Sequence, residues 1–260
     1  MGHIRLGRLP RTVKWNQVVS LIDSGASTAD IALVALDASR KGLQTASKDP
    51  TLIYSLWLLT QVPLAAKGQN FSEELRQRGL EVSQQPTLME VVGAFTDAVD
   101  AYSRRQGIRS DVGEMAQLAA VESFTKLAGE KTRSLFGATP EDVQRAVRSL
   151  STAKRFGTLG RDFFSRFLGR YLSYFLSREL SNHVGRGKRF ANIQEHSAFN
   201  RALDVYCRQA ARIVQEFAGG WFSKTHYEGG IDLKKAGDFA FVALKKIRSE
   251  LEKGEQLNEE

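Results

Sequence analysis

Arg178 and His183 lie five residues apart, near the end of a segment with helical periodicity, and together they could act on a phosphodiester. A histidine can move a proton at neutral pH, and an arginine can stabilise the charge that develops on a phosphate in the transition state. A structural interpretation also exists, because the helix dipole favours a cation at the carboxyl end of a helix. The pair is therefore the candidate catalytic pair, with a helix cap as the alternative.

The residues from Arg178 to His183 read R-x4-H and so resemble the short signature of HEPN-type ribonucleases. The resemblance covers these six residues and an all-helical context. It implies RNA cleavage without a metal ion by the arginine and the histidine, which in that family lie at a helix end, usually in a dimer cleft. The segment from Arg189 to His196 fits a looser R-x(4–6)-H form of the same pattern.

Other chemical signatures are missing or incomplete in the sequence. Glu179 and His183 have the i, i+4 spacing of two metal ligands on one helix face, but no second ligand pair follows at a matching spacing. The single cysteine, Cys207, excludes an internal disulfide and a cysteine-rich zinc site, and a small buried residue is its expected role. The chain has no P-loop, HExxH or GxSxG motif. We therefore expect no metal and no cofactor.

The positive charge of the chain is unevenly distributed. The formal net charge is +8, and residues 151–217 hold twelve Lys or Arg residues against five acids, an excess of seven. Concentrated positive charge is typical of a surface that binds a polyanion, because phosphate contacts release counterions. The alternative is that long arginine side chains cover apolar helix flanks and stay solvated.

Cations of the N-terminal arm and of this region form the predicted nucleic-acid-binding set: Arg5, Arg8, Arg11, Lys154, Arg155, Arg161, Arg166, Arg170, Arg186, Lys188 and Arg189. Residues 185–189 read GRGKR, a turn in which backbone amides and cations could approach one phosphate together. The first prediction is a non-enzymatic nucleic-acid-binding or nucleoprotein-assembly subunit, for DNA or RNA. The alternatives are a HEPN-like ribonuclease and a protein-interaction scaffold whose arginines contact an acidic partner.

The element that must position these residues is a long helix, predicted from about Thr158 to Asn182. One side of it carries a stripe that should face the core: Phe164, Phe167, Leu168, Tyr171, Phe175 and Leu176. A second side carries a small residue at every fourth position: Ser165, Gly169, Ser173 and Ser177. We call these four residues the small-residue row, and they predict close packing of another helix, within the chain or in a homo- or hetero-oligomer. Arg166 and Arg170 form a third flank, toward solvent or a polyanion.

Helical periodicity runs through most of the chain and predicts an all-α fold, a bundle of about eight to nine helices without significant sheet. One helix is predicted to end at Gly219-Gly220, with residues 221–230 as a connector. Helix-boundary signals near residue 138 suggest this division: a basic arm at 1–14, a helical half at 15–137, a basic helical half at 138–253 (or one continuous domain) and an acidic tail at 254–260.

The longest apolar run, Ile53–Val62, has about half the length that a bilayer span needs. The first residues contain no apolar segment of the length found in signal peptides. We therefore expect a soluble cytoplasmic protein without a membrane span.

Overall fold

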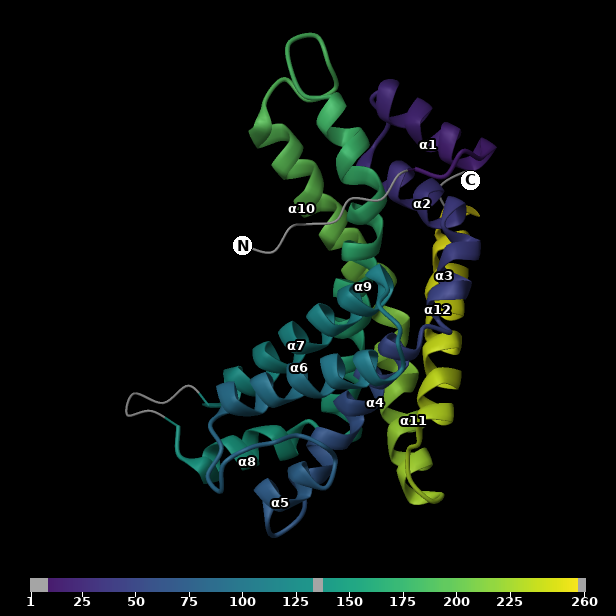
Figure 1. Cartoon of the computed structure of the whole chain (residues 1–260). Helices are drawn as coiled ribbons and strands as arrows, with labels where there is room; N and C mark the ends of the chain where they lie inside the picture. Colours follow the sequence, from purple (N-terminus) through teal and green to yellow (C-terminus); the bar gives the residue numbers. More distant parts are fainter. Residues whose placement is uncertain (1–8, 133–137, 257–260) are drawn as a thin grey trace.

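The computed structural model describes residues 9–132 and 138–256. Within these ranges it contains twelve α-helices and no strand, and residues Val184 and Phe190 form an isolated β-bridge. The predicted all-α class is confirmed, whereas the predicted number of helices is too low (Figure 1). The helices are α1 (Val13–Asp23), α2 (Thr28–Ala38), α3 (Arg40–Ala46), α4 (Pro50–Ala65), α5 (Phe71–Arg76), α6 (Leu88–Arg105), α7 (Asp111–Thr132), α8 (Pro140–Ser149), α9 (Ala153–Asn182), α10 (Ile193–Ala210), α11 (Arg212–Tyr227) and α12 (Leu233–Gln256).

Two of the additional helices arise at breaks that carry no glycine or proline. Ser39 separates α2 from α3, and Ala211 separates α10 from α11, yet both residues keep a right-handed helical backbone. The chain changes direction at these points without the residue types that normally stop a helix. A sequence pattern therefore joins each pair into one helix, which accounts for two of the additional helices.

Helix α9 lies at the centre of the molecule and contacts α7, α10 and α11 (Figure 1). Its 30 residues correspond to about 45 Å of helix. The helix begins five residues before the predicted Thr158, because the Thr152 side chain accepts a hydrogen bond from the backbone amide of Arg155 and caps it there. The predicted apolar stripe faces the core, with the side chains of Phe164, Phe167 and Leu168 fully buried.

Helix α4 is the second centre of packing, since most of its side chains are buried around the whole helix. It contacts α6, α7, α8 and α12. The Trp57 Nε1 and Gln61 Nε2 groups both donate to the backbone oxygen of Ile231, at 2.9 and 3.1 Å, and so hold the segment before α12. Buried side chains from Trp15 to Ile247 belong to one hydrophobic cluster. The division near residue 138 stays a prediction.

Helix α11 continues through Gly219 and Gly220, so the predicted helix end at these glycines is wrong. Gly219 is buried against the first turn of α9, and a Cβ atom there would lie 2.2 Å from the backbone oxygen of Ala153. Gly219 therefore allows α11 and α9 to approach closely, and it does not end the helix. The predicted connector at 221–230 is helical up to Tyr227.

Two further sequence predictions concern membranes and the cysteine. None of the helices in the described ranges has both the length and the apolar character that a bilayer span requires. Cys207 is fully buried on α10. Burial, together with the nearby charge of Asp204, raises the pKa of its thiol to about 12, so the thiolate does not form at neutral pH. This matches the predicted role of a small buried residue.

Candidate functional site

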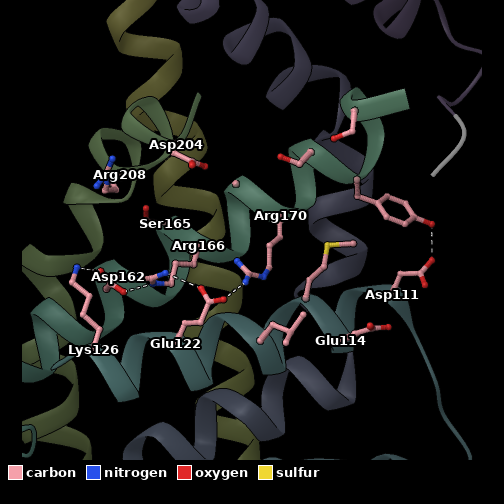
Figure 2. A pocket seen from close by; sticks show the side chains of 16 residues that line it. Asp111, Glu114, Glu122, Lys126, Asp162, Ser165, Arg166, Arg170, Asp204 and Arg208 are labelled. Atoms are coloured by element: carbon pink, nitrogen blue, oxygen red, sulfur yellow. Dashed lines mark hydrogen bonds and ion pairs between the residues drawn. The ribbon is translucent and has the colours of Figure 1, made fainter. Parts of the chain in front are cut away.

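A groove of about 770 Å³ runs between α7, α9 and α10 (Figure 2). Its floor is the small-residue row of α9. One wall comes from α7 and includes the apolar side chains of Met115 and Leu118. The other wall comes from α10 and carries Asp204 and Arg208. The row was expected to pack against another helix, and in this chain it instead lines an open groove.

Close helix packing on α9 occurs at other glycines of the same helix. A Cβ atom at Gly157 would lie 2.7 Å from the backbone oxygen of Gln215, and one at Gly160 would lie 3.4 Å from the Cβ of Ala218. Both contacts are with α11. The face of α9 that packs closely within the chain is therefore different from the face that forms the groove floor.

The serine hydroxyls of the groove floor have no hydrogen-bond partner among residues 9–132 and 138–256. Ser165 is only 6 % exposed, and its hydroxyl has no hydrogen-bond partner among the described residues. Ser181 on the same helix behaves differently, since its hydroxyl donates to the backbone oxygen of Ser177 at 2.7 Å. The Ser165 oxygen is not among the fully buried unpaired atoms of the described residues, so it opens onto the groove. It can donate to, and accept from, a molecule that occupies the groove.

Charged side chains form a continuous network along the base of the α7 wall (Figure 2). Lys126 Nζ lies 2.7 Å from Asp162, and Asp162 accepts a hydrogen bond from Arg166 Nε at 2.5 Å. Arg166 also donates to Glu122 at 2.7 Å, and Glu122 accepts from Arg170 at 2.5 Å. The two arginines predicted to face solvent or a polyanion therefore already have carboxylate partners.

The network shifts the pKa values of its members. Burial acts to raise the pKa of Asp162, but hydrogen bonds from Lys126 and Arg166 and their positive charges outweigh it, and the pKa is lowered overall. Burial acts to lower the pKa of Arg166, but Asp162 and Glu122 outweigh that effect and raise it. Both groups therefore remain charged at neutral pH.

Replacing Asp162 by asparagine should reduce stability in a pH-dependent way. Since the folded-state pKa lies below the unfolded value, the carboxylate stabilises the fold above the unfolded pKa of about 3.9. That contribution is lost as the pH falls through the folded-state pKa. We expect Asp162→Asn to lower the free energy of unfolding at pH 7 by about 1.5–3 kcal/mol, and by much less at pH values below about 3.5.

Urea denaturation at both pH values measures this difference. The control is Asp238→Asn, because Asp238 is exposed on α12 and has no ion pair among the described residues. An equal loss of stability for Asp162→Asn at the two pH values would contradict the role given to its charge.

Five arginines of the predicted nucleic-acid-binding set are bound by groups of the same chain. Arg166 and Arg170 belong to the ion-pair network described above. The other three donate to these acceptors: Arg155 to the Leu127 oxygen at 3.3 Å, Arg161 to the Arg208 oxygen at 3.3 Å and to Gln215 at 3.1 Å, and Arg189 to the Ile22 oxygen at 3.4 Å and the Ala26 oxygen at 2.5 Å. These arginines hold helices together.

The remaining predicted cations lie far from one another in the structure or outside the described residues. Arg5 and Arg8 lie outside the described residues. The others are exposed, although Lys188 Nζ donates to the backbone oxygen of Asn182 at 2.7 Å: Arg11, Lys154, Arg186 and Lys188. Arg11 precedes α1, Lys154 lies in the first turn of α9, and the last two lie in the turn after α9, at the opposite end of a helix about 45 Å long. The structure thus does not gather them into one compact face, and nucleic-acid binding stays a prediction.

The candidate catalytic pair lies at the end of α9, where His183 is the C-cap residue. The Nδ1 atom of His183 lies 3.2 Å from Asp23 of α1, and its Nε2 atom lies 3.4 Å from Glu179. Arg178 is exposed. Both ring nitrogens therefore face carboxylates, an arrangement that ties the end of α1 to α9 and supports the interpretation as a helix cap. Catalysis by the pair stays a prediction.

Several groove residues carried no recognisable signal in the sequence. Glu122 and Lys126 lie on α7 and meet α9 only in the folded chain. Asp204 and Arg208 lie on the exposed side of α10. Asp162 could have been found, because it stands four residues before Arg166, the usual spacing of a helical ion pair.

Comparisons with known proteins identify no relative. No family model matches the sequence, and neither the curated proteins nor the solved structures give a significant match. Among the described residues, no group of three or more His, Cys, Asp or Glu side chains is arranged to hold a metal ion. The geometry of the groove is therefore the main guide to function.

Proposed function

We propose that the protein is a non-enzymatic subunit of a protein assembly and that its groove binds one α-helix of a partner protein. The observation that carries this proposal is the groove floor, where a nearly buried Ser165 hydroxyl without a partner lies in a row of small residues. Small side chains let a second helix backbone approach closely, and serine hydroxyls can form hydrogen bonds across such a contact.

The dimensions of the groove suit a helix. From Ser165 to Ser177 the row extends over about 18 Å, which corresponds to about three turns of a docked helix. Met115 and Leu118 provide apolar surface on one wall, and Leu118 is 46 % exposed. An amphipathic helix would cover this apolar surface with side chains at i, i+3 or i+4, and i+7.

The charges of the groove favour a neutral or basic helix over a polyanion. The lining residues include five acids and four bases: Asp111, Glu114, Glu122, Asp162 and Asp204 against Lys126, Arg166, Arg170 and Arg208. In a chain with a net charge of +8, the groove is thus slightly acidic. Two of the three groove arginines, Arg166 and Arg170, are bound to Glu122 and Asp162, whereas Arg208 has no ion pair among the described residues. Among the functions predicted from sequence, protein docking therefore receives more support here than nucleic-acid binding.

A tryptophan placed in the groove tests the proposal. Ser173 lines the groove, whereas Ser223 is exposed on α11 away from it, so Ser173→Trp and Ser223→Trp form a matched pair. We expect Ser173→Trp to weaken capture of partner proteins at least about tenfold, or ~1.4 kcal/mol. Ser223→Trp should capture the same proteins as wild type.

Cross-linking identifies what occupies the groove. A photoreactive amino acid in place of Leu118 should form adducts with one segment of the partner, at residues spaced i, i+3 or i+4, and i+7. Adducts with nucleic acid, or equal capture by the two tryptophan variants, would overturn the proposal.

A further inference from the structure

Helix α12 presents an exposed face of mixed apolar and basic character, which we call the outer face of α12. Its members share one side of the helix by their spacing: Lys234, Asp238, Phe241, Val242 and Lys245. Phe241 is 40 % exposed and Val242 is 39 % exposed. Two adjacent, partly exposed apolar side chains therefore lie between lysines on this face.

The opposite side of α12 is buried against neighbouring helices. These side chains of α12 are buried: Ala236, Phe239, Ala240, Ala243 and Ile247. They face α4, α11 and other helices that contact α12. In the view of Figure 1, α12 runs along one side of the molecule, and α7 lies on the other. The outer face is the side of α12 that the neighbouring helices leave exposed.

The outer face and the groove match in length. Lys234 and Lys245 are eleven residues apart, about 17 Å along the helix. The groove floor extends over about 18 Å by the same measure. Phe241 and Val242 lie between the two lysines and would face the apolar wall of Met115 and Leu118.

The two surfaces also match in charge. Glu114 on α7 and Asp204 on α10 are exposed groove acids without an ion pair among the described residues. The outer face brings two lysines and one acid, Asp238, and so has the opposite net sign to the groove lining. Complementary charges at the rim of a contact set its register and exclude other partners more than they add affinity.

We propose that the groove of one copy of this chain binds the outer face of α12 of a second copy. The inference rests on the proposed function, because it names the helix that fills the groove. Groove and outer face are different surfaces, so the contact is heterologous. After the first contact the pair keeps one free groove, on one copy, and one free outer face, on the other, and the chain therefore assembles head to tail into rings or open chains.

Sedimentation velocity of the full chain tests this inference. The sample is treated with nuclease first, so that nucleic acid cannot bridge copies of a basic protein. Wild type should show a weight-average mass that rises with concentration up to about 100 µM, where a contact of micromolar Kd is nearly saturated. Ser173→Trp, which fills the groove, and Phe241→Asp, which adds a charge to the outer face, should each stay monomeric.

Mixing the two variants provides the decisive result. Phe241→Asp retains an intact groove, and Ser173→Trp retains an intact outer face, so an equimolar mixture should form a heterodimer and nothing larger. Tyr227→Asp is the control, because Tyr227 is 91 % exposed but lies outside the outer face; this variant should assemble like wild type. Circular dichroism of every variant confirms that the fold is kept.

The outcomes separate this inference from the proposed function. A wild-type chain that stays monomeric at about 100 µM would overturn self-association, while loss of partner capture by Ser173→Trp would still support the groove. A mixture that stays monomeric, or single variants that still assemble, would overturn the pairing of groove and α12.

Discussion

Replacing Gly219 by alanine should lower the free energy of unfolding by roughly 3 kcal/mol, a large effect for one added methyl group. Helix α11 crosses the first turn of α9 so closely that the new Cβ atom would lie 2.2 Å from the backbone oxygen of Ala153 and 2.7 Å from its carbonyl carbon. A backbone cannot rotate away as a side chain can, so the two helices must separate. Separation would loosen the packing of Phe156 on Phe222, whose rings lie 4.1 Å apart.

The neighbouring glycine offers a matched control. Gly220 is exposed on the same helix, and a Cβ atom there would meet nothing within 4 Å. Gly220→Ala should therefore raise the free energy of unfolding by about 0.5–1 kcal/mol, through the better helix propensity of alanine. Urea denaturation of the two variants measures both effects. Equal stability of Gly219→Ala and wild type would contradict the close approach of α11 to α9.

The same pair shows why helix boundaries were only partly predictable. Two adjacent glycines favour a helix end in any local pattern. The residues near Gly219 do not indicate that Ala153, which is distant in the chain, packs against this glycine. At Ser39 and Ala211 the opposite occurs, since the helix breaks where no local signal is present. At Gly219 the deciding contact is non-local, and periodicity within a short window cannot report it.

The candidate site was predictable to the extent that its residues lie on one helix. The spacing along α9 correctly separates the buried stripe from the small-residue row, because both follow from the helical repeat. Whether an arginine is paired within the chain or free depends on residues of other helices, which a local pattern does not reveal. Arg166 meets a carboxylate 44 residues away, and Arg189 meets the backbone of Ile22, 167 residues away. A count of charges therefore overestimates the cations that remain free to bind a ligand.

Replacing Phe164 by alanine should cost about 3–5 kcal/mol of stability, the usual loss for a fully buried phenylalanine. Its side chain is 0 % exposed, and its ring packs edge-on against Phe163 at 4.9 Å and Phe239 of α12 at 6.1 Å. The melting temperature should fall by on the order of 10 °C. Phe241→Ala is the control, because that ring is 40 % exposed and its loss should cost less than about 1 kcal/mol.

The Phe164→Ala variant also tests how the chain is divided. The tryptophans lie in α1, α4 and α11, so their fluorescence reports on both sides of residue 138. Because buried side chains from both sides form one hydrophobic cluster, and α4 holds the segment before α12 through Ile231, fluorescence and circular dichroism should show one shared transition. If the cavity at Phe164 instead produced two separate transitions, residues 15–137 and 138–253 would unfold as independent domains. The contacts of α4 with α12 would then be too weak to couple them.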